Sequence, residues 1–297
     1  LLSRKFREIE NDINENGVYS SIGKDRILPY DFENVFTDFT HNSVEYPALI
    51  YDGPFSDGKT YNFRALENTE EIDEKSAKEK AEKVFGIENV KVYLTENKTE
   101  VYAVTGDCRG ADALLMLTKK GGFPLLFDCY DNSYQSDTSQ NTARRSEYEK
   151  TAVDYMQSVG LKNLVPVWYN LKDGIAFVNL APEIDGVIYY TDLVKVKLAA
   201  STQKVLGFEC SGYCAGSNKT NLAPLIDEET ASASVSDKIN IKNVRLAVIP
   251  VGEKEVFCYE IAGSYEGLDY FIYVDAQNGR EVNVLRVVDN KQGSMTM

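Results

Sequence analysis

Residues 117 to 125 read Leu-Thr-Lys-Lys-Gly-Gly-Phe-Pro-Leu, which predicts a strand, a turn at Gly121-Gly122 and a second strand. The same eight-residue spacing between flanking apolar positions recurs at Leu198–Leu206 and at Val274–Val282, and the copies begin 81 and 76 residues after the preceding one. Each copy follows a helix-like segment and further alternating runs. The pattern therefore predicts an array of three units, each large enough to bury most of a small core of its own.

These units are expected to have an α+β fold, with one helix packed on an antiparallel sheet. Their predicted bounds are 67–135, 136–216 and 217–297, and polar linkers at 131–139 and 211–222 span the two junctions. The first and third units open alike, because Asp73 and Asp227 each follow Ile, precede Glu and are suited to cap a helix. Residues 1–66 predict a helix followed by an irregular aromatic extension.

Composition and charge exclude several classes of partner. With 46 acidic and 32 basic residues the formal net charge is −14, which argues against nucleic acid and anionic membranes because both require clustered Lys and Arg. No run approaches the roughly 18 apolar residues that span a bilayer, and no signal peptide opens the chain. Because the chain starts at Leu1 without Met, we expect a truncated chain, so the lack of a signal or anchor does not indicate where the native protein is located.

Residues for catalysis or metal binding are scarce. The one imidazole, His41, lies in a polar loop, and neither Ser211 nor Cys214 sits in a nucleophile-elbow pattern that it could serve. The cysteines are too few and scattered for a disulfide framework, and buried thiols are expected instead: Cys108, Cys129, Cys210, Cys214 and Cys258. We predict no catalytic residue, no metal site and no cofactor.

Tyrosines near the unit boundaries are the candidate partner-binding residues. Aromatic side chains there could anchor a protein or stack on sugars, although they could equally join neighbouring units. The candidates are Tyr134, Tyr189, Tyr190 and Tyr213. Structural turns with positive φ are expected at Gly121, Gly122, Asn278 and Gly279.

The last strand and turn resemble a known domain family. Residues 273–282, Tyr-Val-Asp-Ala-Gln-Asn-Gly-Arg-Glu-Val, are similar to the hydrophobic-Asp-x-x-x-Gly-x-x-hydrophobic ending of PepSY domains. The first two units keep the turn length but lack the Asp. Three such units, preceded by Glu-Tyr-Pro-Ala-Leu-Ile-Tyr-Asp-Gly-Pro-Phe-Ser at 45–56, resemble the C-terminal region of the YpeB family of spore germination proteins over nearly the whole chain.

This resemblance implies a function. It implies a non-enzymatic protein that stabilises, localises or restrains a cortex-lytic hydrolase resembling SleB, at the extracytoplasmic face of the spore inner membrane or in the cortex. It also implies cortex peptidoglycan as a second ligand. The family has an N-terminal membrane anchor and a helical domain, so the resemblance implies membrane attachment through a missing anchor and makes residues 1–66 the tail of a truncated helical domain. Two alternatives stay open, a PepSY-type peptidase inhibitor and an enzyme that acts on peptidoglycan. A reactive-site loop would favour the first and two facing carboxylates the second, and the sequence displays neither.

Overall fold

The chain divides into two compact units, Leu1–Glu45 and Tyr46–Met297. The computed structural model describes residues 66, 68–95, 101–131, 145–216, 222–252, 254–290 and 293–296, all within the second unit. The predictions for residues 1–65, including the loop that holds His41, therefore lie outside the described residues, and so does Tyr134.

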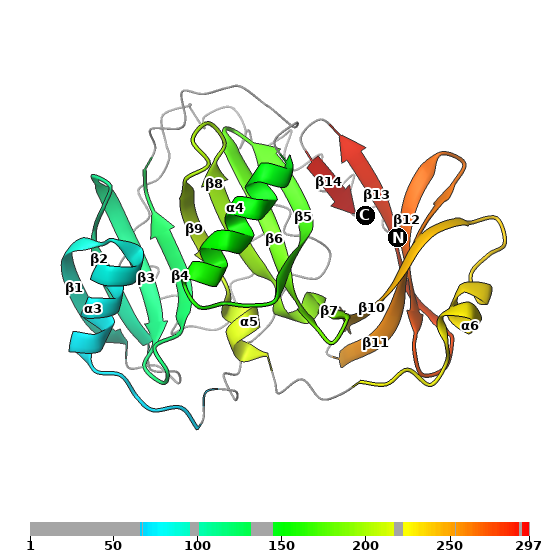
Figure 1. Cartoon of the computed structure of the whole chain (residues 1–297), viewed down its shortest axis with the longest axis horizontal. Helices are drawn as coiled ribbons and strands as arrows, with labels where there is room; N and C mark the ends of the chain where they lie inside the picture. Colours follow the sequence, from blue (N-terminus) through cyan, green and yellow to red (C-terminus); the bar gives the residue numbers. More distant parts are fainter. Residues whose placement is uncertain are drawn as a thin grey trace, which may run out of the picture. The chain divides into compact units, whose positions relative to one another are not determined.

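A first group of elements follows the predicted helix-and-strand order (Figure 1). It consists of α3 (Glu74–Phe85), β1 (Glu88–Thr95), β2 (Val101–Cys108), β3 (Ala111–Thr118) and β4 (Pro124–Cys129). The helix starts where expected, because the Asp73 carboxylate accepts a hydrogen bond from Ser76 N at 2.8 Å. It ends at Gly86, whose φ of 64° is the left-handed cap that glycine favours.

The second group repeats this order with three insertions. Its main elements are α4 (Arg145–Ser158), β5 (Leu164–Lys172), β6 (Ile175–Ile184), β8 (Val194–Ala199) and β9 (Val205–Glu209). The insertions are β7 (Val187–Tyr189), the 3-10 turn η4 (Tyr190–Asp192) and α5 (Ser211–Ala215). Residues 211–215 were expected to be linker, but they form a short helix that covers β4 and β8.

The third group has a shorter helix and longer strands. It consists of α6 (Glu228–Ala233), β10 (Asn240–Val251), β11 (Lys254–Tyr265), β12 (Leu268–Asp275), β13 (Glu281–Asn290) and β14 (Gly293–Thr296). Asp227 caps α6 as Asp73 caps α3, by accepting a hydrogen bond from Thr230 N at 2.8 Å. None of the described helices combines the length and apolarity needed to cross a membrane.

The first and third groups share side-chain contacts as well as element order. Tyr102 of β2 donates its hydroxyl hydrogen to Ile72 O at 3.0 Å, and Tyr259 of β11 donates to Ile226 O at 2.9 Å. In both groups the accepting residue immediately precedes the helix cap. A register shift also recurs in the third hairpin-like pairing of each group, next to Leu117, Leu198 and Val274.

The strands do not remain in three separate sheets, which corrects the sequence prediction. They form one sheet in the order β1-β2-β3-β4-β9-β8-β6-β5-β14-β13-β12-β11-β10-β7, with an additional pairing between β6 and β7. Strands β4 and β9 join the first two groups edge to edge and antiparallel. The second and third groups are joined twice, through the parallel pair β7–β10 and the antiparallel pair β14–β5. The fold is nonetheless α+β and dominated by strands, as predicted.

Three buried clusters fill this arrangement. The largest lies under α3 and α4, which cover the same face of the joined sheet (Figure 1). The second cluster draws residues from β5, β6, β7 and β10 to β13. Together with β14, these strands pair with one another in a closed ring that joins the second and third groups, hereafter the ring. The third lies between α6 and the outer face of β10, β11 and β12.

Candidate functional site

The most distinctive polar site lies in the ring between the second and third groups. Glu260 of β11 is 1% exposed and is surrounded by the second hydrophobic cluster. Arg245 Nε donates to Glu260 Oε1 at 2.6 Å, and the Tyr273 hydroxyl donates to Glu260 Oε2 at 2.9 Å. Arg245 Nη2 also donates to the Tyr190 hydroxyl at 2.8 Å. The four side chains, hereafter the joint network, connect η4 to β10, β11 and β12.

Neighbouring strands position these groups through register. Arg245 pairs directly with Glu260, and Glu260 pairs directly with Tyr273, so the three side chains lie side by side on one face of the sheet. Tyr190 follows β7, which runs parallel to β10. The joint network therefore depends on the connection between the second and third groups.

Burial sets the protonation of the joint network. It raises the pKa of the Tyr190 and Tyr273 hydroxyls well above 10, and the Glu260 carboxylate raises both further because it repels a phenolate. Burial by itself lowers the pKa of Arg245, but its surroundings, which include the Glu260 carboxylate that accepts its hydrogen bond, leave that pKa raised. The site thus holds one buried ion pair and two neutral phenols.

The joint network has a structural role rather than a catalytic one in this fold. Both oxygens of Glu260 accept hydrogen bonds from the protein, and its side chain is almost completely removed from water. A general base must instead reach the proton that it abstracts. Glu260 could act in that way only if the ring opened.

The predicted partner-binding tyrosines are placed differently from expectation. Tyr189 is 4% exposed and Tyr190 is 1% exposed, so neither is available to a partner on this surface. Consecutive strand residues point to opposite faces, and Tyr190 accordingly packs in the second cluster while Tyr189 packs in the third. These two tyrosines join neighbouring groups. Tyr213 of α5 is half-buried against the first cluster, and burial raises its pKa.

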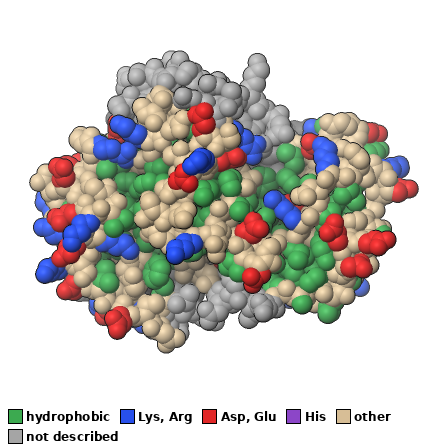
Figure 2. Space-filling view, viewed as in Figure 1, with side chains coloured by type: hydrophobic (Ala, Val, Ile, Leu, Met, Phe, Trp, Pro, Cys, Tyr) green, Lys and Arg blue, Asp and Glu red, His purple; other side chains and the backbone are tan. Residues whose placement is uncertain are grey.

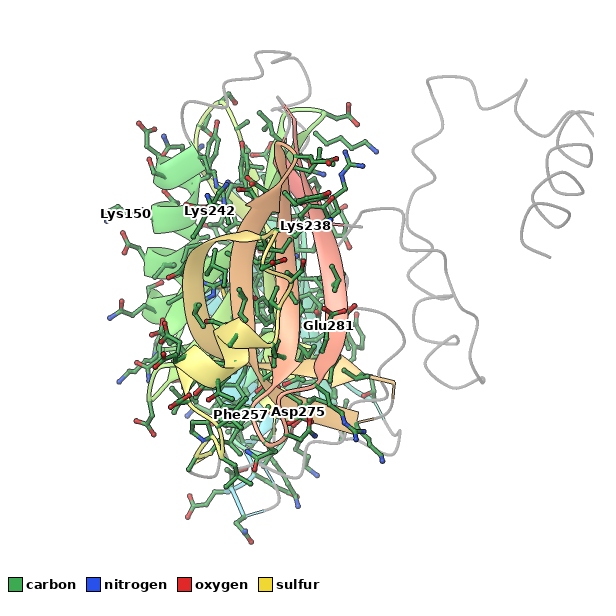
Figure 3. The ribbon with its side chains drawn as sticks, turned by 90° about the vertical axis from the view of Figure 1, so that its right-hand side faces the viewer. Lys150, Lys238, Lys242, Phe257, Asp275 and Glu281 are labelled. Carbon is green, nitrogen blue, oxygen red and sulfur yellow. The ribbon has the colours of Figure 1, made fainter. Side chains whose placement is uncertain are left out.

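The predicted turns contain the expected backbone geometry at glycine. Gly121, Gly122 and Gly279 have φ values of 72°, 58° and 72°. Asn278 is not among the residues with positive φ and supports its turn through its side chain instead. Its Nδ2 donates to Asp275 Oδ2 at 2.8 Å, and its Oδ1 accepts from Arg280 N at 3.0 Å. Figure 3 shows Asp275 beside Phe257 at the end of the sheet where this turn lies.

The five cysteines are all buried, and none of them forms a disulfide. Cys210 Sγ donates to Pro124 O at 2.8 Å. Burial raises the pKa of Cys129, Cys210 and Cys258, which keeps these thiols protonated and poorly nucleophilic. Within the described part of the chain, no three His, Cys, Asp or Glu side chains are grouped as metal ligands.

Sequence reasoning missed Glu260 and Arg245. A signal was present, because Glu260 is the single charge in the run Val-Phe-Cys-Tyr-Glu-Ile-Ala at 256–262. A carboxylate inside such an apolar strand is seldom buried without a partner. Its partner could not be identified from the sequence, since several Lys and Arg residues precede it.

Comparisons with known proteins agree with the resemblance noted in the sequence. The family model described as "YpeB sporulation, PepSY1 and PepSY2 domains" matches residues 32–223, more than half of the chain. The sporulation protein YpeB of Oceanobacillus iheyensis is 26% identical over 231 residues, covering 75% of this chain and 50% of the relative. The YpeB protein of Bacillus subtilis is 25% identical over 231 residues, covering 72% and 49%.

A solved structure shows the same fold. The C-terminal domain of Bacillus megaterium YpeB matches with a TM-score of 0.64 and 23% identity, covering 74% of this chain and 99% of that domain. The chain spans about half the length of the curated relatives that it matches. From the extent of the family-model match, this chain belongs to the YpeB sporulation family.

Proposed function

We propose that this chain is a non-enzymatic sporulation protein that binds a cortex-lytic hydrolase resembling SleB and stabilises, localises or restrains it. The observation that carries the proposal is the family match across residues 32–223. The joint network fits the non-enzymatic part of the proposal, because Glu260, the most buried carboxylate among the described residues, has both oxygens occupied by protein donors. The site of action would be the extracytoplasmic face of the spore inner membrane or the cortex.

We also assign the third helix-and-strand group to the PepSY fold, which gives three PepSY units at 67–135, 136–216 and 217–297. The family model covers the first two. The third shares the Asp cap, the register shift and the buried tyrosine contact to the residue before the cap. Because these three features are independent of one another and occur at equivalent positions, they support the same fold for the third group as for the first.

The charge of the chain suggests how a partner would be recognised. A net charge of −14 favours a more basic protein, since complementary fields accelerate encounter while apolar contacts supply most of the affinity. With Tyr189 and Tyr190 buried, the candidates that remain are Tyr213 and, outside the described residues, Tyr134.

Titration calorimetry between this chain and the purified hydrolase would test the proposal. We expect a complex whose association slows as salt rises, and Tyr213→Ala should weaken it if α5 contacts the partner. Tyr213→Phe is the matched control, because it keeps the packing of the ring. Absence of a complex at any salt concentration would contradict the binding role.

A second assay addresses the enzymatic alternative directly. The purified chain should release no muropeptides from cortex peptidoglycan, while the hydrolase in parallel should release them. Muropeptide release by the chain alone, retained after removal of contaminating hydrolase, would overturn the non-enzymatic assignment.

A further inference from the structure

Strand β1 ends the sheet, and its outer edge carries no strand among the described residues. The first strands of the other two groups, β5 and β10, have paired outer edges. Strand β5 is paired on its outer edge by β14, and β10 is paired by β7. Figure 1 shows β1 at the far left of the described elements. Among the described strands, β1 is therefore the one of the three equivalent strands whose outer edge is not paired.

The usual protection of an edge strand covers only half of β1. Natural edges are blunted by bulges and charges, and here the irregular part comes early in the strand, as a register shift between Glu88 and Lys91 that includes Asn89 with a φ of 52°. From Lys91 to Thr95 the pairing with β2 is continuous. The middle residue of this regular stretch is Tyr93.

The regular stretch exposes apolar surface on both faces. Tyr93 is 52% exposed and Leu94 is 39% exposed. Val92 packs partly against the first cluster, on the α3 side, and alternation places Leu94 on that same side and Tyr93 on the other. Val84 of α3, 43% exposed, adds to the uncovered apolar surface of this group.

The chain contains an internal precedent for how such edges meet. Strands β4 and β9 occupy equivalent places in the first two groups, and they pair antiparallel with Phe127 opposite Phe208. Phe127 and Phe208 occupy the same position in their respective groups. The two groups are therefore related by an approximate two-fold axis that passes between these two phenylalanines.

We propose that β1 is an interface for a second copy of this chain, which pairs antiparallel through its own β1 with Tyr93 opposite Tyr93 of the second copy. In this register Val92 faces Leu94 of the second copy, and Leu94 faces Val92. Lys91 faces Thr95 and so meets no like charge. The pairing is self-complementary, it avoids the irregular residues 88–90, and it covers the exposed apolar side chains of the strand.

Electrostatics gives this interface a recognisable salt dependence. Each copy carries a net charge of −14, so two copies repel each other at long range. On the face shown in Figure 2, acidic and basic side chains are interspersed over α3 and β1, so the local surface adds no strong attraction. Added salt should therefore strengthen self-association, whereas it should weaken binding to a basic partner.

Sedimentation of the whole chain over a concentration series provides the first test. We expect a reversible dimer that tightens with salt. Tyr93→Lys places two like charges opposite each other and should raise the dissociation constant about ten-fold or more. Leu225→Lys is the control, since Leu225 is 77% exposed in the third group and should leave the dimer unchanged.

Cysteine cross-linking tests the register. Residues directly opposite in an antiparallel pair have Cα atoms about 4.5–5.5 Å apart, within reach of a disulfide. Under mild oxidation Tyr93→Cys should form a covalent dimer, while Lys91→Cys alone should not. A mixture of Lys91→Cys and Thr95→Cys chains should cross-link. The native cysteines are buried, and the unmodified chain controls for them.

Two results would overturn the proposal: a wild-type chain that stays monomeric across the series, and equal cross-linking of Lys91→Cys and Tyr93→Cys. If the chain is monomeric and Tyr93→Lys also abolishes hydrolase binding, the edge belongs to the hydrolase. Failure of the hydrolase complex with a dimer intact would instead count against the proposed function alone.

Discussion

Phe127 of β4 and Phe208 of β9 lie directly opposite each other, with ring centroids 6.0 Å apart. Phe85 of α3 packs against both, at centroid distances of 5.4 and 6.1 Å. This aromatic trio stands where the first two groups meet, so it contributes to both cores at once. The first two groups should consequently unfold together.

Replacing Phe208 tests that coupling. Phe208→Ala removes a 4%-exposed ring that also contacts Tyr155, and it should lower the free energy of unfolding by about 3–5 kcal/mol. Urea denaturation followed by fluorescence would measure the loss. Phe208→Leu, which keeps most of the apolar volume, should cost clearly less. A loss below 1 kcal/mol in the Ala variant would show that the aromatic contact between the first two groups contributes little to the stability of the fold.

Breaking the joint network should be costly. Glu260→Ala removes the carboxylate that accepts hydrogen bonds from Arg245 and Tyr273, and we expect the free energy of unfolding to fall by about 3 kcal/mol. This is the lower end of the range for broken buried pairs, because the Arg245 side chain keeps 33% of its surface exposed. Glu255→Ala, an exposed carboxylate on the same strand, is the control and should change the unfolding free energy by less than about 0.5 kcal/mol.

Replacing both charged partners separates packing from pairing. The double variant Glu260→Leu with Arg245→Leu should recover much of the stability lost in Glu260→Ala, because no buried charge remains unpaired. An equally unstable double variant would show that the hydrogen bonds to Tyr190 and Tyr273, rather than the ion pair, dominate.

Tyr169 and Tyr148 form a matched pair of hydroxyls. Their ring centroids are 6.0 Å apart, but the Tyr148 hydroxyl donates to Ala200 O at 3.0 Å, whereas the buried Tyr169 hydroxyl has no hydrogen-bond partner among the described residues. Tyr148→Phe should therefore lose about 1 kcal/mol, while Tyr169→Phe should be neutral or stabilising by up to about 1 kcal/mol at pH 7. Thermal unfolding of both variants would compare them, and equal losses would contradict the difference in bonding.

Tyr169 also predicts sensitivity to alkali. Burial first, and the neighbouring Tyr148 second, raise its pKa to about 12, against about 10 in the unfolded chain. A folded-state pKa above the unfolded value means that the stability is fully present below pH 10 and is lost as pH rises from about 10 to 12. The free energy of unfolding, measured across this pH window, should decline less steeply in Tyr169→Phe than in the wild type. Parallel curves would contradict the assignment.

Substitutions at two turn glycines distinguish the cost of a positive φ from the cost of steric contact with the new Cβ. A Cβ at Gly279 would lie 3.6 Å from Ile226 Cδ1, an ordinary contact, so Gly279→Ala should cost about 1 kcal/mol through its positive φ alone. At Gly122 the nearest atom, Ile72 Cδ1, would be 2.9 Å away, so Gly122→Ala should cost more. Calorimetric melting of the two variants would rank them, and the reverse order would refute this reading.

The sequence by itself determined the local elements, because their causes are local. Asp73 and Asp227 cap helices with their own side chains, and the glycines at 121, 122 and 279 adopt positive φ because they lack a Cβ. The α+β class and the family resemblance follow from the same repeated patterns.

Only the tertiary structure decided which edges meet. The pairing of β4 with β9 and of β7 with β10 joins strands far apart in the chain, and β7 is three residues long, too short for periodicity to reveal. For that reason Tyr189 and Tyr190 read as boundary anchors in the sequence but lie buried in the fold. Alternation fixes which side chains share a face, whereas the partner strand that covers them is chosen by the packing of the whole sheet.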